Sequence, residues 1–150
     1  MDDLRLLEGW VQPMIDTLDR KARTTMARQI AREVRKEQQQ RIKAQRNPDG
    51  TAYTPRRKQR NKRGQIKRAA MFAKIRTARY MKATATASGA AIQFVGPVAK
   101  IAEVHQYGLR DKIDRRKPRT HKYNARQLLG VSDKTRRIVS RAVLEALPSK

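Results

Sequence analysis

The sequence predicts an α+β fold: a small antiparallel sheet flanked by a long N-terminal helix and a C-terminal helix, with mobile basic loops. Three observations lead to this prediction. Residues 13–45 carry apolar side chains mostly four positions apart, a spacing typical of a helix. Residues 79–96 alternate alanine with hydroxyl side chains and then turn at a glycine, as β-hairpins do. Residues 132–147 return to helical spacing after a serine.

The first element is a short apolar turn at residues 4–10, and the long helix follows it. We expect this helix to begin near Pro13, because proline is tolerated in a first turn, and to reach about Gln45. Each four-residue step turns the apolar stripe by about 40°, so the stripe winds far around the axis. One flat sheet cannot cover it. We expect its first half to pack on its own domain, and its second half either to contact something else, such as a neighbouring subunit, or to be a solvated end with Ile42 as a stray apolar residue.

The helix is expected to stop at residues 47–50, because Asn47-Pro48-Asp49-Gly50 combines a helix breaker with an Asp-Gly turn. Residues 51–68 hold too few apolar side chains to bury a core, so we predict an arm or loop there. A short helical segment at residues 69–75 follows it. The basic side chains of this arm are Arg56, Arg57, Lys58, Arg60, Lys62, Arg63, Lys67 and Arg68.

After the hairpin, residues 98–105 show helical spacing, and Gly108 stands where a left-handed C-terminal cap belongs. Residues 110–122 are predicted as a second basic loop, and residues 123–129 as a final strand. Ser132 is a good N-cap for the last helix, which closes before Pro148. The second loop owes its charge chiefly to Arg115, Arg116, Lys117 and Arg119.

Charge sets the clearest limit on function. At 150 residues we expect one domain spanning residues 1–150, and its net charge is +24. Residues 1–19 carry five acids and one arginine, so −4, whereas residues 47–82 and 110–127 carry +11 and +6. Such self-repulsion calls for an anionic counterpart: nucleic acid, an acidic protein surface or a negative membrane. With 38% apolar residues the core is thin, which favours burial against copies of the chain or other partners.

Several functional classes are disfavoured. The chain has no cysteine, which excludes disulfides and thiolate metal sites, and no apolar run of membrane-spanning length. Its basic helix is poor in the Trp and Phe that anchor helices at membrane surfaces. The two histidines lack metal-site spacing, and no glycine-rich phosphate loop occurs. We therefore expect no enzyme, no catalytic residues, no metal and no cofactor. His105 fits a packed, hydrogen-bonded role better than a catalytic one, and a nuclease with an unrecognised site is the remaining enzymatic alternative.

Nucleic-acid binding stays open at this point. The basic stretches suit contact with phosphates. Aromatic residues for stacking on bases are nearly absent from them, and no base-reading motif appears, so specific recognition is disfavoured. Non-specific contact with nucleic acid, as in ribosomal or nucleoid proteins, and contact with an acidic protein have equal support.

A set of short motifs recurs in a characteristic order. The long helix ends in Gln45-x-Asn47-Pro48-Asp49-Gly50, and Tyr53-x-Pro55-Arg56 follows. Then come Met71-Phe72-x-x-Ile75-Arg76, His105-Gln106-Tyr107-Gly108 and Ala125-Arg126-x-Leu128-Leu129-Gly130-Val131-Ser132. Over nearly its whole length the chain resembles the virion morphogenesis, or tail-completion, family of contractile-tailed bacteriophages. One departure is Asn124, where such proteins often have proline, and this puts the local backbone there in question.

The resemblance implies a non-enzymatic virion protein that finishes the tail at its head-proximal end and helps make it competent for head joining. Related neck and tail-completion proteins form rings, commonly hexameric, around the DNA passage. It further implies copies of the chain and other tail or neck proteins as partners, non-specific contact with DNA in transit, no membrane, and assembly in the host cytoplasm.

The resemblance also suggests roles for individual residues. Pro48, Asp49 and Gly50 would end the long helix and redirect the chain, and Gly130 matches a family glycine. His105, Gly108 and Arg126 would shape the loop joining the sheet to the last helix. Arg126 would either pair with an acid of a neighbour or be solvated. The arm at residues 56–68 would order on assembly, facing DNA or an acidic tail-tube surface. Residues 1–19 would engage the basic surface of an adjacent subunit.

Overall fold

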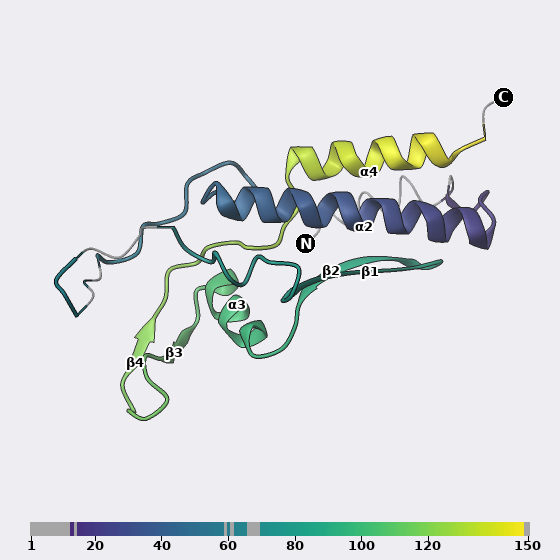
Figure 1. Ribbon diagram of the computed structural model, residues 1–150. Coiled ribbons are helices and arrows are strands. Elements are labelled where there is room, and N and C mark those ends of the chain that lie inside the picture. Colours follow the sequence, from purple (N-terminus) through teal and green to yellow (C-terminus); the bar gives the residue numbers. More distant parts are fainter. Residues whose placement is uncertain (1–12, 14, 59, 61, 66–69, 149–150) are drawn as a thin grey trace.

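A computed structural model describes residues 13, 15–58, 60, 62–65 and 70–148, and three layers organise it (Figure 1). The long helix α2 (Arg20–Lys43) is the middle layer. Helix α4 (Asp133–Ala146) lies along one side of it, and the hairpin of β1 (Met81–Thr86) and β2 (Gly89–Phe94) lies along the other. The predicted α+β class, with a long helix before the sheet and a helix after it, is confirmed.

The remaining elements gather toward the C-terminal end of α2. Helix α3 (Val98–Tyr107) follows the first hairpin, and a second hairpin pairs β3 (Arg110–Lys112) with β4 (Thr120–Lys122). The described residues thus contain two separate two-stranded antiparallel sheets rather than one. The hairpin expected within residues 79–96 is confirmed, with Thr86 paired to Gly89 at its turn.

Four local predictions are wrong. Helix α2 starts at Arg20 rather than near Pro13, because Asp19 caps it and accepts a hydrogen bond from the Ala22 N–H at 2.7 Å. The described part of residues 69–75 forms turns, and a φ of 66° at Phe72 is incompatible with a helix. Residues 123–129 form no strand, whereas the predicted loop at residues 110–122 contains β3 and β4.

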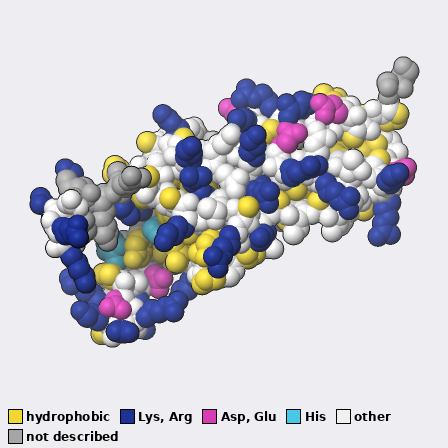
Figure 2. Space-filling view, viewed as in Figure 1, with side chains coloured by type: hydrophobic (Ala, Val, Ile, Leu, Met, Phe, Trp, Pro, Cys, Tyr) yellow, Lys and Arg dark blue, Asp and Glu magenta, His cyan; other side chains and the backbone are white. Residues whose placement is uncertain are grey.

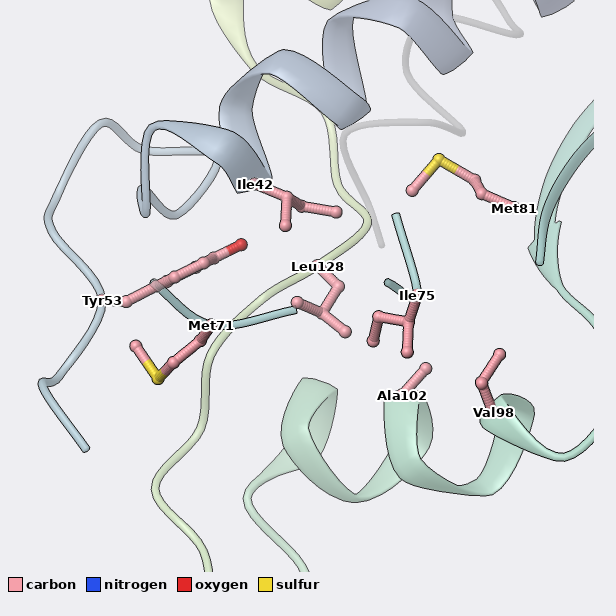
Figure 3. Close-up of a cluster of buried hydrophobic side chains, with 8 residues drawn as sticks. All are labelled: Ile42, Tyr53, Met71, Ile75, Met81, Val98, Ala102 and Leu128. Atoms are coloured by element: carbon pink, nitrogen blue, oxygen red, sulfur yellow. The ribbon is translucent and has the colours of Figure 1, made fainter. Parts of the chain in front are cut away.

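The core has two parts, one on each side of α2. Figure 3 shows the larger, in which Ile42 and Leu128 are fully buried. Between α2 and α4 lies the smaller, made of Leu18, Met26, Ala142 and Val143. The winding apolar stripe of α2 is therefore covered by its own chain at both ends, by α4 first and by the larger cluster later. Both earlier alternatives for its second half, a neighbouring molecule or a solvated end, are wrong. The larger cluster comprises Ile42, Tyr53, Met71, Ile75, Met81, Val98, Ala102 and Leu128.

Both predicted helix caps are confirmed. Gly108 has a φ of 63°, in the left-handed region, and its N–H donates to the Val104 carbonyl. The Ser132 hydroxyl accepts from the Thr135 N–H at 3.1 Å, at the start of α4. None of the helices in the described part of the chain combines the length and apolar character needed to cross a membrane.

Candidate functional site

Two basic stretches far apart in sequence lie at the same end of the molecule, beyond the C-terminal end of α2 (Figure 1). We call residues 56–65 and 110–122 together the basic end. Figure 2 shows Lys and Arg side chains over this end, besides others along the helices. All its singled-out bases are exposed except Arg56, which is half-buried; Lys67 and Arg68 of the predicted arm lie outside the described residues. The exposed bases are Arg57, Lys58, Arg60, Lys62, Arg63, Arg115, Arg116, Lys117 and Arg119.

An extended segment, residues 125–130, connects the basic end to α4, and we call it the crossing segment. Four of its backbone N–H groups, those of residues 127–130, donate to side-chain amides instead of a neighbouring strand. The Gln127 N–H donates to Asn47 Oδ1 at 3.0 Å, and the N–H groups of Leu128 and Leu129 both donate to Gln106 Oε1, at 2.8 and 2.9 Å. A segment with strand-like sequence therefore needs no strand partner, because side chains supply the bonds that a sheet would.

Gln38 of α2 holds the end of the crossing segment. It is 2% exposed. Its Oε1 accepts from the Gly130 N–H at 3.1 Å, and its Nε2 donates to the Gly130 carbonyl at 2.9 Å. Both backbone groups of one residue are thus bound by one side chain, as a neighbouring strand would bind them.

Arg41 of α2 holds the carbonyls of the same segment. Its Nη1 donates to the Gln127 carbonyl at 3.0 Å and its Nη2 to the Leu128 carbonyl at 2.9 Å. Glu37 lies one turn earlier, 3.6 Å from Arg41 Nε, and both side chains are buried. Burial lowers the pKa of Arg41, and the nearby charges of Tyr53 and Glu37 oppose this shift. A buried ion pair with several hydrogen bonds thus fixes the crossing segment to α2, and removing either partner would leave an uncompensated charge.

The motif residues meet one another around the crossing segment. A Cβ built on Gly130 would lie 2.4 Å from Pro48 Cγ, so the proline ring packs directly on the glycine. A Cβ on Gly108 would lie 2.9 Å from the Ala125 nitrogen. Gly50 has a φ of 89°, and Asp49 accepts from the Thr51 N–H at 2.9 Å in the same turn. Gly130 and Gly108 thus serve close packing, whereas Asp49 and Gly50 shape the turn after α2.

Arg126 links the start of the arm to the end of α3. It is 5% exposed, its Nε donates to the Thr54 carbonyl at 2.7 Å, and its N–H donates to the His105 carbonyl at 2.7 Å. The solvated alternative is wrong, because this guanidinium is buried against the start of the arm. Burial lowers the pKa of Arg126. Residue 126 therefore fixes the start of the arm relative to the end of α3.

His105 lies in a chain of aromatic rings. Its ring centroid is 4.9 Å from that of Phe72 and 5.0 Å from that of Tyr123, both edge-on. Burial, and secondly the charge of Arg126, lowers the pKa of His105. The ring is packed as expected, although the buried Nδ1 has no hydrogen-bond partner in the described part of the chain.

The comparisons with known proteins agree on one family. The model of the phage virion morphogenesis family matches residues 2–148. The chain belongs to this family. It is also 35% identical, over 150 residues, to tail completion protein S of Escherichia phage P2, across 98% of this chain and 99% of the relative. No solved structure matches the chain.

This morphogenesis protein contains supporting residues that sequence reasoning missed. Gln38 belongs to a run of three glutamines, and only its position opposite residue 130 gives it a role. Tyr53 and Gln106 belong to the motifs that carry the family resemblance, Tyr53-x-Pro55-Arg56 and His105-Gln106-Tyr107-Gly108. The Tyr53 hydroxyl donates to the Gln127 carbonyl at 2.9 Å, and burial raises its pKa to about 12 despite the opposing charge of Arg41.

Proposed function

We propose that this protein is a structural, non-enzymatic component that completes the phage tail at its head-proximal end and makes it competent for head joining. One observation carries the proposal: 35% identity to a tail completion protein across nearly the full length of both chains.

The arrangement of the basic end supports a role in assembly. Both basic stretches lie at the same end of the molecule, and Arg126 bonds the crossing segment to the start of the arm, so that their charges can act together on one partner. In our proposal several copies form a ring around the DNA passage. The basic arm orders on contact with the anionic partner, and the protein assembles in the host cytoplasm and is carried in the virion tail. Copies of itself and other tail or neck proteins are its partners.

A phage that lacks the gene tests this function. We expect full heads beside unjoined or overlong tails in electron micrographs, and restored particles when the protein is supplied from a plasmid. A variant with Arg115→Gln and Arg116→Gln should restore fewer particles than one with Arg28→Gln and Arg32→Gln, two exposed bases of α2. Normal tails and normal phage yield after deletion would refute the proposal.

A nucleic-acid-binding role of the ribosomal or nucleoid type is the second candidate, and the exposed bases gathered at one end favour it. Such a protein binds duplex DNA or RNA with an affinity that falls steeply as salt rises, because counterions are released. Tight binding with a steep salt slope, together with normal tails after deletion, would favour this candidate over the first.

A further inference from the structure

The basic end also carries exposed apolar side chains. Ile113 is 58% exposed, Tyr107 is 62% exposed, and Ile101 and Leu109 are 47% and 41% exposed. They belong to adjoining elements: Ile101 and Tyr107 lie on α3, whereas Leu109 and Ile113 flank β3. In Figure 2, hydrophobic surface lies among Lys and Arg side chains at this end. We call these four residues the apolar edge.

One ion pair sets the geometry of the apolar edge. Lys100 Nζ of α3 lies 3.6 Å from Asp111 Oδ1 of β3, so the two elements are adjacent. Side chains alternate along a strand, and Leu109 and Ile113 therefore share the strand face of Asp111, the face toward α3. The seven bases and two acids of residues 110–122, net +5, surround this edge.

This combination suits a protein partner better than nucleic acid. A duplex presents phosphates and sugars to a basic surface, and contact with phosphates requires no large aliphatic side chains. Exposed apolar side chains rimmed by charge are typical of protein–protein interfaces. The complementary ligand is therefore a peptide that is both acidic and apolar.

The chain itself contains such a peptide. Residues 2–12 carry three acids and one arginine, so −2, in a protein whose net charge is +24. The same residues include Leu4, Leu6, Leu7 and Trp10, the chain's one tryptophan. Because tryptophan is a frequent interface anchor, this segment has the apolar side chains to pack on the apolar edge and the negative charge to meet the bases of residues 110–122.

The position of this segment in the chain favours docking on a second copy. It precedes α2, whose 24 residues span about 36 Å, and the basic end lies beyond the other end of that helix. A segment attached at one end of a subunit and a receiving surface at the other make a head-to-tail contact. Contacts of this kind generate rings when their rotation closes.

We propose that residues 2–12 of one copy dock on the apolar edge and the bases of residues 110–122 of the next copy. This inference rests on the proposed function, because it names the contact that would close the assembly at the tail end. The basic end then faces acidic residues of the protein itself at this contact.

The oligomeric state of the full chain tests the contact. By sedimentation velocity, Ile113→Asp should raise the protein concentration at which half the chains are assembled by about tenfold or more. Leu144→Asp is the matched control, since Leu144 is 65% exposed on α4, and it should leave assembly unchanged. Emission of Trp10 should shift to shorter wavelength as wild-type chains assemble. A protein that is monomeric at all concentrations, equal behaviour of the two variants, or an unshifted emission would overturn the proposal.

Charge exchange identifies the occupant. Replacing Arg115, Arg116, Lys117 and Arg119 together with Glu changes residues 110–122 from +5 to −3, and Asp2→Lys with Asp3→Lys changes residues 2–12 from −2 to +2. Each of these two variants should assemble poorly alone, and an equimolar mixture should assemble, since each segment then meets a surface of opposite charge. Normal assembly of either variant alone, or failure of the mixture, would exclude residues 2–12 as the occupant. Duplex DNA should bind wild type and Ile113→Asp equally. If Ile113→Asp loses DNA affinity along with its assembly, the apolar edge serves nucleic acid instead.

Failure of this inference is distinguishable from failure of the proposed function. If the deletion phage matures normally, the proposed function fails whatever the assembly results. If the deletion phenotype appears but Ile113→Asp assembles and restores particles like wild type, the docking contact alone fails.

Discussion

Replacing Gly130 with alanine should destabilise the protein, because the added methyl group would overlap the ring of Pro48. The new Cβ would lie 2.4 Å from Pro48 Cγ and 3.1 Å from its Cβ, well inside van der Waals contact. Relief requires movement of one partner. Gly130 is held on both backbone groups by Gln38, at 3.1 and 2.9 Å. Pro48 lies in a turn closed by the hydrogen bond from the Asn47 N–H to the Thr51 carbonyl at 2.8 Å.

Because both sides are fixed, we expect a loss of about 1–3 kcal/mol in the free energy of unfolding, the range for overpacking a well-packed site. Urea titration followed by circular dichroism measures it. Gly89→Ala is the control, since a Cβ there meets nothing within 4 Å. Pro48→Ala shortens the side chain that clashes, so the double variant should recover at least half of the loss.

Two results would refute this reasoning. If Gly130→Ala unfolds at the same urea concentration as Gly89→Ala, the turn and the crossing segment yield more easily than their hydrogen bonds indicate. If the two substitutions add without coupling, the loss arises elsewhere than at the proline ring.

Three further predictions concern the crossing segment and the aromatic chain. Gln106→Leu leaves two N–H groups and one carbonyl without their amide, and should cost about 1–3 kcal/mol in urea unfolding, partly compensated by water. Tyr53 has its pKa raised to about 12 in the folded state, so the unfolded phenol ionises first and stability should fall as pH rises from about 10 to 12; Tyr53→Phe should lack this fall. The pKa of His105 is lowered in the folded state, so its contribution to stability is present above about pH 6.5 and is lost as pH falls toward the folded pKa. His105→Phe should therefore weaken the dependence of the melting temperature on pH over this range.

Each of these has a matched comparison. Gln93→Leu removes an exposed amide from β2 and should change stability little. Tyr107→Phe removes an exposed hydroxyl and should leave the alkaline fall intact. His121→Phe should leave the acid response intact. A variant that matches its comparison would show that the named hydrogen bonds or buried ring do not control stability at that site.

Local signals in the sequence were sufficient for much of the fold. Gly108 and Ser132 predict helix ends because a left-handed cap and a hydroxyl cap depend on neighbouring residues alone. Alternation and a glycine turn likewise locate the first hairpin. Asp19 was overlooked as a cap because Pro13 gave a second plausible start, which moved the predicted beginning of α2 by several residues.

Contacts between residues far apart in the chain could not be predicted from the sequence. Residues 123–129 have the composition of a strand, and nothing nearby in the chain shows that amides from residues 47 and 106 bond their backbone N–H groups. Ile42 was judged without knowing that the chain returns to cover it. At the candidate site, the basic residues were evident from charge, whereas the contact of Pro48 with Gly130 joins motifs more than 80 positions apart.

The way Gln38 holds Gly130 has a consequence for synthesis of the protein. The two residues are 92 positions apart, so residue 130 leaves the ribosome long after residue 38. Until then the amide on α2, the Arg41 guanidinium and the Gln106 side chain face water without the carbonyls and N–H groups they later bind. Contacts of such separation slow folding, because the loop must close before any of them forms. The structure around the crossing segment can therefore form only after residue 130 has emerged from the ribosome.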